Sequence, residues 1–204
     1  MHRILNIAGN ENNNVDLIEH PKADFIFITS VKADINIISD LIEDKEFLLF
    51  QDNFRALEIS NLNTFAQIDN YFLKTINYAK IVVLRLFGDK GTWSYGLEQL
   101  IKWKEVNLNK TLLILSGTDE EDLSLNELSS VDLDTSLKIS KLLKSGGKEN
   151  YRRFLYCLSY LSSNETNIPQ KYISNVSYPD PYQYDWKNEK GLKVGIISYK
   201  SLFL

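Results

Sequence analysis

Cysteine and histidine are nearly absent from this sequence of 204 residues, which holds one cysteine, Cys157, and two histidines, His2 and His20. A single cysteine forms no intrachain disulfide, and a cysteine-based zinc site needs several thiolates. Two histidines are too few for a histidine-rich transition-metal site. We therefore expect no metal site within the chain.

Long apolar runs and an excess of positive charge are also missing. No window approaches the ~18 apolar residues of a membrane span, and the N-terminus lacks the apolar core of a signal peptide. The formal net charge is −4, whereas nucleic acids and anionic membranes attract basic surfaces. We expect a cytoplasmic protein with no membrane and no nucleic-acid partner.

Hydrophobic residues, at 44% of the chain, are sufficient for a core. Short apolar runs rich in β-branched and aromatic residues predict strands, and apolar residues at helical spacing predict helices. The predicted strands are residues 2–7, 24–29, 46–50, 80–87, 111–116 and 193–199. The predicted helices are residues 31–44, 65–78, 96–107, 132–144 and 148–162. Residues 55–62 are expected to be a linking segment, for which an extended conformation is left open.

This alternation predicts an α/β fold with a mostly parallel sheet and helices on both faces, of the flavodoxin or Rossmann kind. We expect a domain over residues 1–163, a linker over 164–191 that holds three of the four prolines, and the first strand of a following domain over 192–204. On this interpretation the chain is the N-terminal part of a longer protein. The alternative is that residues 193–199 return to the same sheet and complete it.

The loop after the strand at residues 80–87 is the candidate binding site, because ligands of open parallel sheets bind beyond the carboxyl ends of strands. Its glycines permit close approach, its aromatic rings offer faces for stacking, and its cations suit carboxylates. The candidate residues are Arg85, Gly88, Lys90, Gly91, Trp93, Tyr95 and Gly96. Two alternatives remain open: the two aromatic rings pack the loop onto the sheet, and Arg85 pairs with a neighbouring carboxylate.

Other motifs favour structural roles. The spacing of the loop glycines matches no nucleotide-binding motif, and no catalytic triad or carboxylate pair can be argued from spacing. The acidic residues 119–122 suit a hard cation in principle, but a solvated loop is the preferred interpretation. Cys157 lies at helical spacing with Phe154 and Leu158, which predicts a core position, and His20 is expected in a turn. We expect the tyrosines of the linker to pack it against the domain; they are Tyr172, Tyr178, Tyr182 and Tyr184.

Residues 80–88 (KIVVLRLFG) and 93–98 (WSYGLE) together resemble a block of the large subunit of aerobic cobaltochelatase, the CobN family. That family has a strand ending in V-V-R-L-x-G-G, then Y-W-x-Y-G and a helix. Weaker similarities, in the same order as in the family, are residues 24–30 (DFIFITS), 113–119 (LILSGTD), 146–150 (GGKEN) and 193–199 (KVGIISY). Asp89 departs from the pattern, since the family usually has a second glycine there.

The resemblance implies a segment of a much longer subunit that binds the corrin precursor hydrogenobyrinic acid a,c-diamide and inserts cobalt(II) in cobalamin biosynthesis. It implies that ATP is hydrolysed on a separate motor subunit, with an adaptor subunit as a further partner. The related magnesium chelatase large subunit acts on protoporphyrin and is the alternative family. The metal-inserting residues of the family lie beyond Leu204, so we place no catalytic residue in this chain.

Three functions remain open. The segment contributes to corrinoid binding in a chelatase, or it is a structural domain that docks other subunits without a ligand of its own. The third is a stand-alone α/β protein that binds a flavin or a similar ligand at the strand ends.

Overall fold

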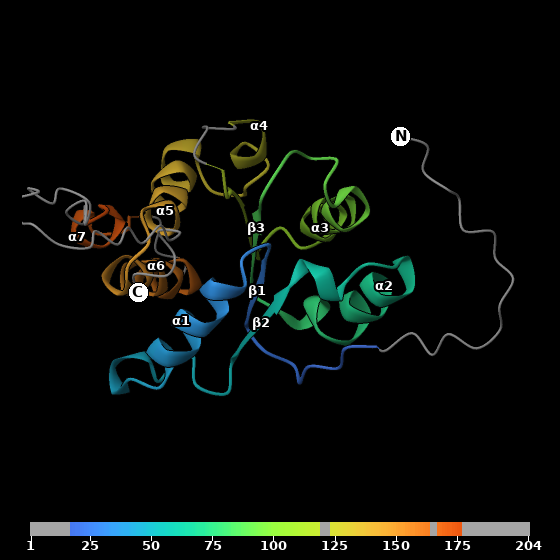
Figure 1. The fold of residues 1–204 in the computed structure, drawn as a ribbon, viewed down its shortest axis with the longest axis horizontal. Helices are drawn as coiled ribbons and strands as arrows, with labels where there is room; N and C mark the ends of the chain where they lie inside the picture. The colour runs from blue at the N-terminus through green and yellow to red at the C-terminus, as the bar shows by residue number, and fades with distance from the viewer. Residues whose placement is uncertain (1–16, 119–122, 164–166, 177–204) are drawn as a thin grey trace, which may run out of the picture.

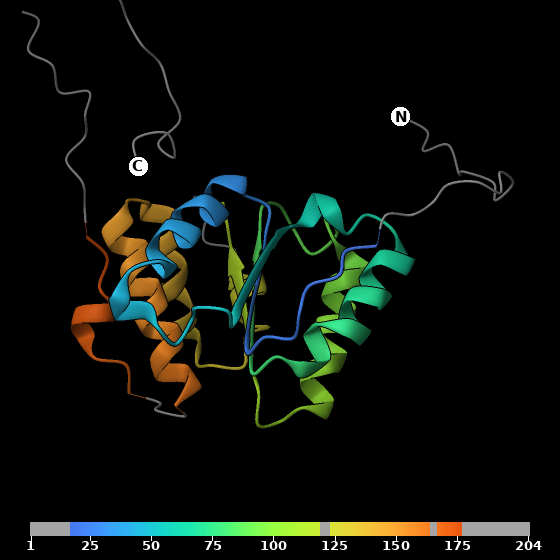
Figure 2. The ribbon, with the colours of Figure 1, turned by 90° about the horizontal axis from the view of Figure 1, so that it is seen from below.

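A computed structural model describes residues 17–118, 123–163 and 167–176. Four parallel strands form one sheet in the order β2-β1-β3-β4. The strands are β1 (Phe25–Thr29), β2 (Phe54–Glu58), β3 (Ile81–Leu86) and β4 (Thr111–Ser116). The helices of one face are α1 (Lys32–Ile42), α5 (Leu133–Ser145) and α6 (Lys148–Ser162), and those of the other are α2 (Phe65–Lys74) and α3 (Ser94–Val106). Figures 1 and 2 show the helices on both sides of the sheet, which confirms the predicted fold class.

Two buried clusters hold these layers together. Alternate residues of β1, β3 and β4 point to opposite faces of the sheet, as the two-residue repeat of a strand requires. Phe27 and Val83 pack with Phe154 of α6, whereas Ile28 and Leu84 lie in the cluster of α2 and α3. Because both faces are covered, the strands are continuously apolar rather than alternating.

The remaining elements are short. They are the 3-10 turns η1 (Lys45–Phe47), η2 (Ile59–Asn61) and η3 (Ile76–Tyr78) and the one-turn helices α4 (Leu123–Asn126) and α7 (Gln170–Ile173). Gly146 ends α5 with φ at +67°, a conformation that favours glycine. Cys157 is fully buried, as predicted, and burial raises the pKa of its thiol to about 12.

The prediction of a strand over residues 46–50 is wrong. The segment is η1 followed by turns, and the strand is β2, where a linking segment was expected. Phe47 and Phe50 both enter the core at a spacing of three residues, while Leu48 and Leu49 between them are exposed. A strand would have alternated, so a short apolar run misled the interpretation.

The predicted helix over residues 65–78 ends at Lys74 and is followed by η3. Phe65 at its start is 67% exposed, and the buried positions are Ile68 and Tyr71. Thr64 caps the helix with Gln67 in a reciprocal capping box, which explains why the helix begins there.

Several predictions fall on residues outside the described ranges. These are the strands at 2–7 and 193–199, the acidic loop at 119–122 and most of the proposed linker. Residues 167–176 of that linker are described and pack on the domain, with Ile168 and Ile173 buried. Tyr172 stacks on Tyr156 of α6 with ring centroids 4.3 Å apart.

Candidate functional site

The candidate loop, residues 87–93, leaves the carboxyl edge of the sheet between β3 and α3. Three strand ends meet there. The Ser30 amide donates to the Arg85 carbonyl at 3.0 Å, and the Gly117 amide donates to the Leu86 carbonyl at 2.8 Å. The Phe87 amide donates to Ser30 Oγ at 3.2 Å. The loop therefore lies where ligands of open parallel sheets bind.

Arg85 points into the protein rather than out of the loop. Its Nη1 lies 2.6 Å from Asp34 Oδ1 of α1, and the two residues are 5% and 0% exposed. Arg85 Nη2 donates to the Leu143 carbonyl at 3.3 Å. Thr29 Oγ1 and the Tyr151 hydroxyl also donate to the Asp34 carboxylate, at 2.8 and 2.5 Å. Of the two alternatives for Arg85, the structure shows the ion pair with a carboxylate.

This buried cluster of Arg85, Asp34, Tyr151 and Thr29 joins β1, β3, α1 and α6. Burial raises the pKa of Tyr151, and the negative charge of Asp34 adds to the effect, so the hydroxyl stays protonated and donates. Arg85 Nε is buried and has no hydrogen-bond partner among the described residues. The cluster fixes the strand end from which the loop departs.

Trp93 lies beneath the first turn of α3. It is 7% exposed, and its Nε1 donates to the Leu62 carbonyl at 3.1 Å. A Cβ added at Gly96 would collide with the indole ring, so the ring occupies the space that the missing side chain leaves. The structure brings Trp93 and Gly96 together as a packing pair, and the indole faces are covered by protein.

Tyr95 faces α2 instead of the loop. Its hydroxyl donates to Asp69 Oδ1 at 2.6 Å, and this hydrogen bond raises the pKa of Tyr95. Its ring packs on Phe65 with centroids 4.4 Å apart. Phe65 and Leu73 are 67% and 63% exposed on the same helix. We call the exposed side of α2 that bears Phe65 and Leu73 the α2 face, and Tyr95 packs beside it on Phe65.

Gly88, Lys90 and Gly91 lie in the exposed part of the candidate loop, residues 87–92. Gly88 has φ at +105°, a conformation that favours glycine. Asp89 Oδ1 accepts from the Gly91 amide at 2.8 Å, which closes a local turn. Asp89, where the resembling family usually has glycine, thus serves the loop through its side chain. Lys90 is the only cation among the seven candidates whose charged group is exposed.

Asp34 and Tyr151 were not among the sequence candidates. The sequence evidence for a carboxylate here was Arg85 itself, because a guanidinium inside an apolar strand requires a carboxylate partner. Asp34 stands in the first turn of the helix that follows β1, and the register pairs Thr29 of β1 with Arg85. The register of parallel neighbours, which the sequence leaves undetermined, decides this pairing.

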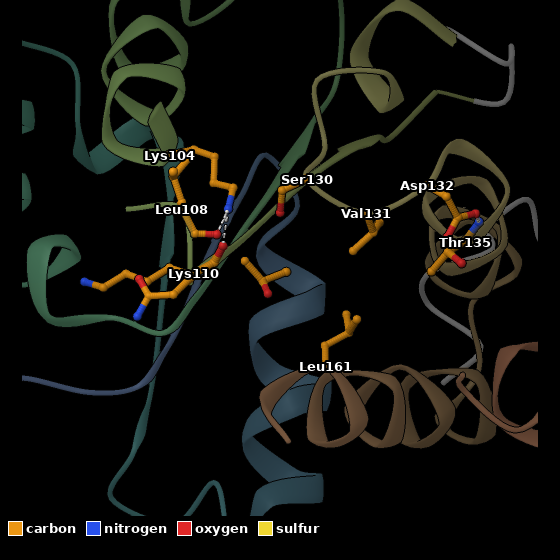
Figure 3. Close-up of a pocket in the computed structure, with 10 residues that line it drawn as sticks. Lys104, Leu108, Lys110, Ser130, Val131, Asp132, Thr135 and Leu161 are labelled. Atoms are coloured by element: carbon orange, nitrogen blue, oxygen red, sulfur yellow. Dashed lines mark hydrogen bonds between the residues drawn. The ribbon is translucent and has the colours of Figure 1, made fainter. Parts of the chain in front are cut away.

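A separate cavity of about 430 Å³ lies at the opposite, amino edge of the sheet, where β4 begins (Figure 3). Leu161 of α6 and Val131 contribute apolar surface, and Asp132 and Thr135 stand at the start of α5. Lys104 Nζ donates to the carbonyls of Leu108 and Lys110 at 2.8 and 2.6 Å, as the dashed lines show. Backbone carbonyls of the protein therefore already satisfy the Lys104 ammonium group.

Within the described ranges, no group of three or more histidine, cysteine, aspartate or glutamate side chains is arranged to hold a metal ion. In the same ranges, none of the helices combines the length and apolarity needed to cross a bilayer.

Comparison with known proteins supports the resemblance. No protein-family model matches the chain. The aerobic cobaltochelatase subunit CobN of Pseudomonas aeruginosa is 30% identical over 111 residues, which is 53% of this chain and 9% of that protein. CobN of Sinorhizobium sp. is 26% identical over 175 residues, 84% of this chain and 13% of that protein.

One solved structure is similar in fold. It is the catalytic subunit of cobaltochelatase from Mycobacterium tuberculosis, with a TM-score of 0.55 and 20% identity over 78% of this chain and 12% of that one. The predicted resemblance to CobN is confirmed, and the chain spans about a tenth of the length of the curated relatives that it matches.

Proposed function

We propose, from the premise that this chain is a CobN-like segment, that it serves as part of the large subunit of a chelatase that inserts cobalt(II) into hydrogenobyrinic acid a,c-diamide. The proposal includes ATP hydrolysis on a separate motor subunit and an adaptor subunit as partner. The similarity over 84% of the chain to a CobN protein carries the proposal. Catalytic residues belong to the rest of that subunit, and this segment has a binding or positioning role.

Within that function, we assign the exposed part of the candidate loop to the corrinoid. A corrin precursor carries several carboxylates, for which the exposed Lys90 ammonium is a suitable partner. Arg85 and Trp93 act indirectly, because Asp34 and Gly96 hold them inside the protein. They position the loop, and they do not contact the ligand in this arrangement.

A titration of the chain with hydrogenobyrinic acid a,c-diamide, followed by tryptophan fluorescence, tests this assignment. We expect Lys90→Ala to weaken binding about tenfold, the effect of losing one charge-assisted contact of ~1.4 kcal/mol. Lys102→Ala is the matched control, because Lys102 is an exposed lysine that pairs with Glu98 on its own helix, α3. Equal affinity of the parent and the Lys90→Ala protein for the corrinoid would contradict the assignment of the loop to the binding site.

Metal choice needs a separate experiment. A chimera in which this chain replaces the matching segment of Pseudomonas aeruginosa CobN is expected to retain ATP-dependent insertion of cobalt with that enzyme's own partners. Folded chimeric protein that inserts no cobalt would contradict membership in the cobalt enzyme and would favour the magnesium chelatase alternative.

The second candidate function is docking without a ligand. The exposure of Phe65 and Leu73 on the α2 face favours it, because exposed apolar clusters mark interaction surfaces. In the same chimera, a Phe65→Ser/Leu73→Ser double substitution that abolishes assembly, with Lys90→Ala having no effect, would support docking over ligand binding.

A further inference from the structure

The two edges of the sheet differ in how their backbone groups are satisfied. At the outer edge of β4, Ser129 Oγ and Ser130 Oγ accept from the amides of Ile114 and Leu112, each at 2.8 Å. The same hydroxyls donate to the carbonyls of these two residues, at 3.1 and 3.2 Å. Serine side chains thus take the place of a fifth strand, and this edge is closed.

The outer edge of β2 is open. Along a strand, the backbone N–H and C=O groups of successive residues point alternately to the neighbouring strand on one side and to that on the other. Since the Asn53 carbonyl accepts from the Phe25 amide of β1 at 3.2 Å, residues 53, 55 and 57 face β1, and residues 54, 56 and 58 face outward. Arg55 Nη1 covers the Phe54 carbonyl at 2.8 Å. Within the described ranges, the Ala56 amide, the Ala56 carbonyl and the Glu58 amide have no hydrogen-bond partner.

Such an edge is a template for another extended segment. Ala56 and Glu58 are half-buried, and β2 presents apolar side chains on both faces of the sheet. Phe54 and Ala56 adjoin the cluster of α1 and α6, and Leu57 lies in the cluster of α2. A strand added here therefore needs apolar residues on both of its faces.

We propose that residues 2–7 (HRILNI) are the occupant and form a fifth strand along β2. Ile4 falls on one face of such a strand and Leu5 and Ile7 on the other, which matches the two apolar faces of β2. Described residues just downstream already pass beside β2. Arg55 Nε donates to the Pro21 carbonyl at 3.2 Å, and Figures 1 and 2 show this first segment, in dark blue, crossing on the β2 side of the sheet.

The connection is long enough. Residues 8–16 span up to about 30 Å when extended, and β2 itself has only five residues. A segment tethered this closely competes at an effective concentration in the millimolar range. The added strand would cover the β2 edge and leave the candidate loop, which lies at the carboxyl ends of the strands, unobstructed. The proposal is independent of the corrinoid and of the chelatase partners.

Amide hydrogen exchange of the 204-residue chain tests the proposal. We expect slow exchange at the amides of Ala56 and Glu58 in the parent, and exchange at least ~10-fold faster in Ile4→Pro, because proline removes a strand donor. Asn12→Pro, in the asparagine-rich stretch, and Ile196→Pro, in the other predicted terminal strand, are matched controls that should leave both amides protected. Unchanged protection at Val83, in the central strand β3, shows that each variant is folded.

Three results would overturn the proposal. Free exchange of both amides in the parent would mean that the edge stays open. Loss of protection in Ile196→Pro, with Ile4→Pro unaffected, would assign the edge to residues 193–199. Protection that disappears on dilution of the parent would assign it to a second copy of the chain.

Discussion

At the scale of single residues, the Arg85–Asp34 pair illustrates how costly a buried charge is without its partner. Both groups are removed from water, and their attraction offsets the desolvation only while both are present. Arg85 lies near the carboxyl end of the inner strand β3 and Asp34 lies on α1, so the pair also fixes how α1 sits on β3.

Removing one member should therefore destabilise the protein strongly. We expect Asp34→Ala to lower the free energy of unfolding by about 3–5 kcal/mol, because it leaves the guanidinium buried and unpaired. Urea denaturation followed by circular dichroism measures the change. Glu98→Ala, which breaks the exposed pair with Lys102, is the control and should cost less than ~1 kcal/mol. Similar decreases in the free energy of unfolding in the two variants would show that the Arg85–Asp34 pair is hydrated.

His20 is a residue whose protonation should weaken the fold. Its Nδ1 lies 2.9 Å from the Tyr71 hydroxyl, and Thr75 Oγ1 donates to its carbonyl at 3.2 Å. Burial, with the nearby positive charge of Arg55 as a smaller cause, lowers the pKa of His20 from its ordinary value of 6.5. Because the pKa is lower in the folded state, the unfolded chain binds the proton more readily.

The stability contributed by neutral His20 should thus be present above pH 6.5 and be lost as the pH falls through the lowered pKa. We expect the urea midpoint of the parent to fall between about pH 7.5 and 5.5 by more than that of His20→Asn. The comparison with His20→Asn cancels the other titrating groups. Parallel pH dependence of the two proteins would mean that His20 titrates normally.

At the scale of elements, the start of α3 depends on the interlock of Trp93 with Gly96. Helix propensity alone would favour almost any residue over glycine here, yet a side chain at 96 would occupy the space of the indole ring. The sequence indicated the glycine and the tryptophan as binding residues, whereas their packing against each other appears only when the helix is placed.

We expect Gly96→Val to lower the free energy of unfolding by about 1–3 kcal/mol, the usual cost of overpacking. The displaced indole should also shift the tryptophan fluorescence toward longer wavelength. Gly91→Ala is the control, because its added Cβ would meet only the Asp89 side chain, at 3.1 Å from Oδ1. If Gly96→Val is as stable as Gly91→Ala, the indole ring has room to move.

Elements with a strong pattern were predicted well, and those with a weak one were not. The strands β1, β3 and β4 lie in continuous apolar runs, which burial on both faces requires, and the predicted bounds agree within one or two residues. β2 has one buried residue, Leu57, because it lies at the edge. Edge position is a property of the sheet, so the local sequence favoured residues 46–50 instead.

At the scale of the whole molecule, two buried clusters share one sheet. Phe154 belongs to the cluster of α1, α5 and α6, and Leu100 to that of α2 and α3. Since β1, β3 and β4 contribute side chains to both, loss of either cluster removes one side of the same strands. The described part of the chain should unfold as one unit.

Phe154→Ala and Leu100→Ala should each lower the free energy of unfolding by about 2–5 kcal/mol. Both side chains are fully buried, so each substitution leaves a cavity in the core. In each variant, near- and far-ultraviolet circular dichroism should report the same urea midpoint. Leu108→Ala, at a position 82% exposed, is the control and should change the stability by less than ~0.5 kcal/mol. Two separate transitions in either variant would show that the two faces unfold independently.

The sequence by itself determined the α/β class, the three strands buried on both faces, most helices and the similarity to CobN. These depend on periodicity and short motifs, which are local properties of the chain. The tertiary structure alone decided which strand lies at the edge and which carboxylate meets Arg85. It also decided that Trp93 fills the space beside Gly96. Such pairings join residues far apart in the sequence, and only the register of the strands and the packing of helices on the sheet bring them within contact distance.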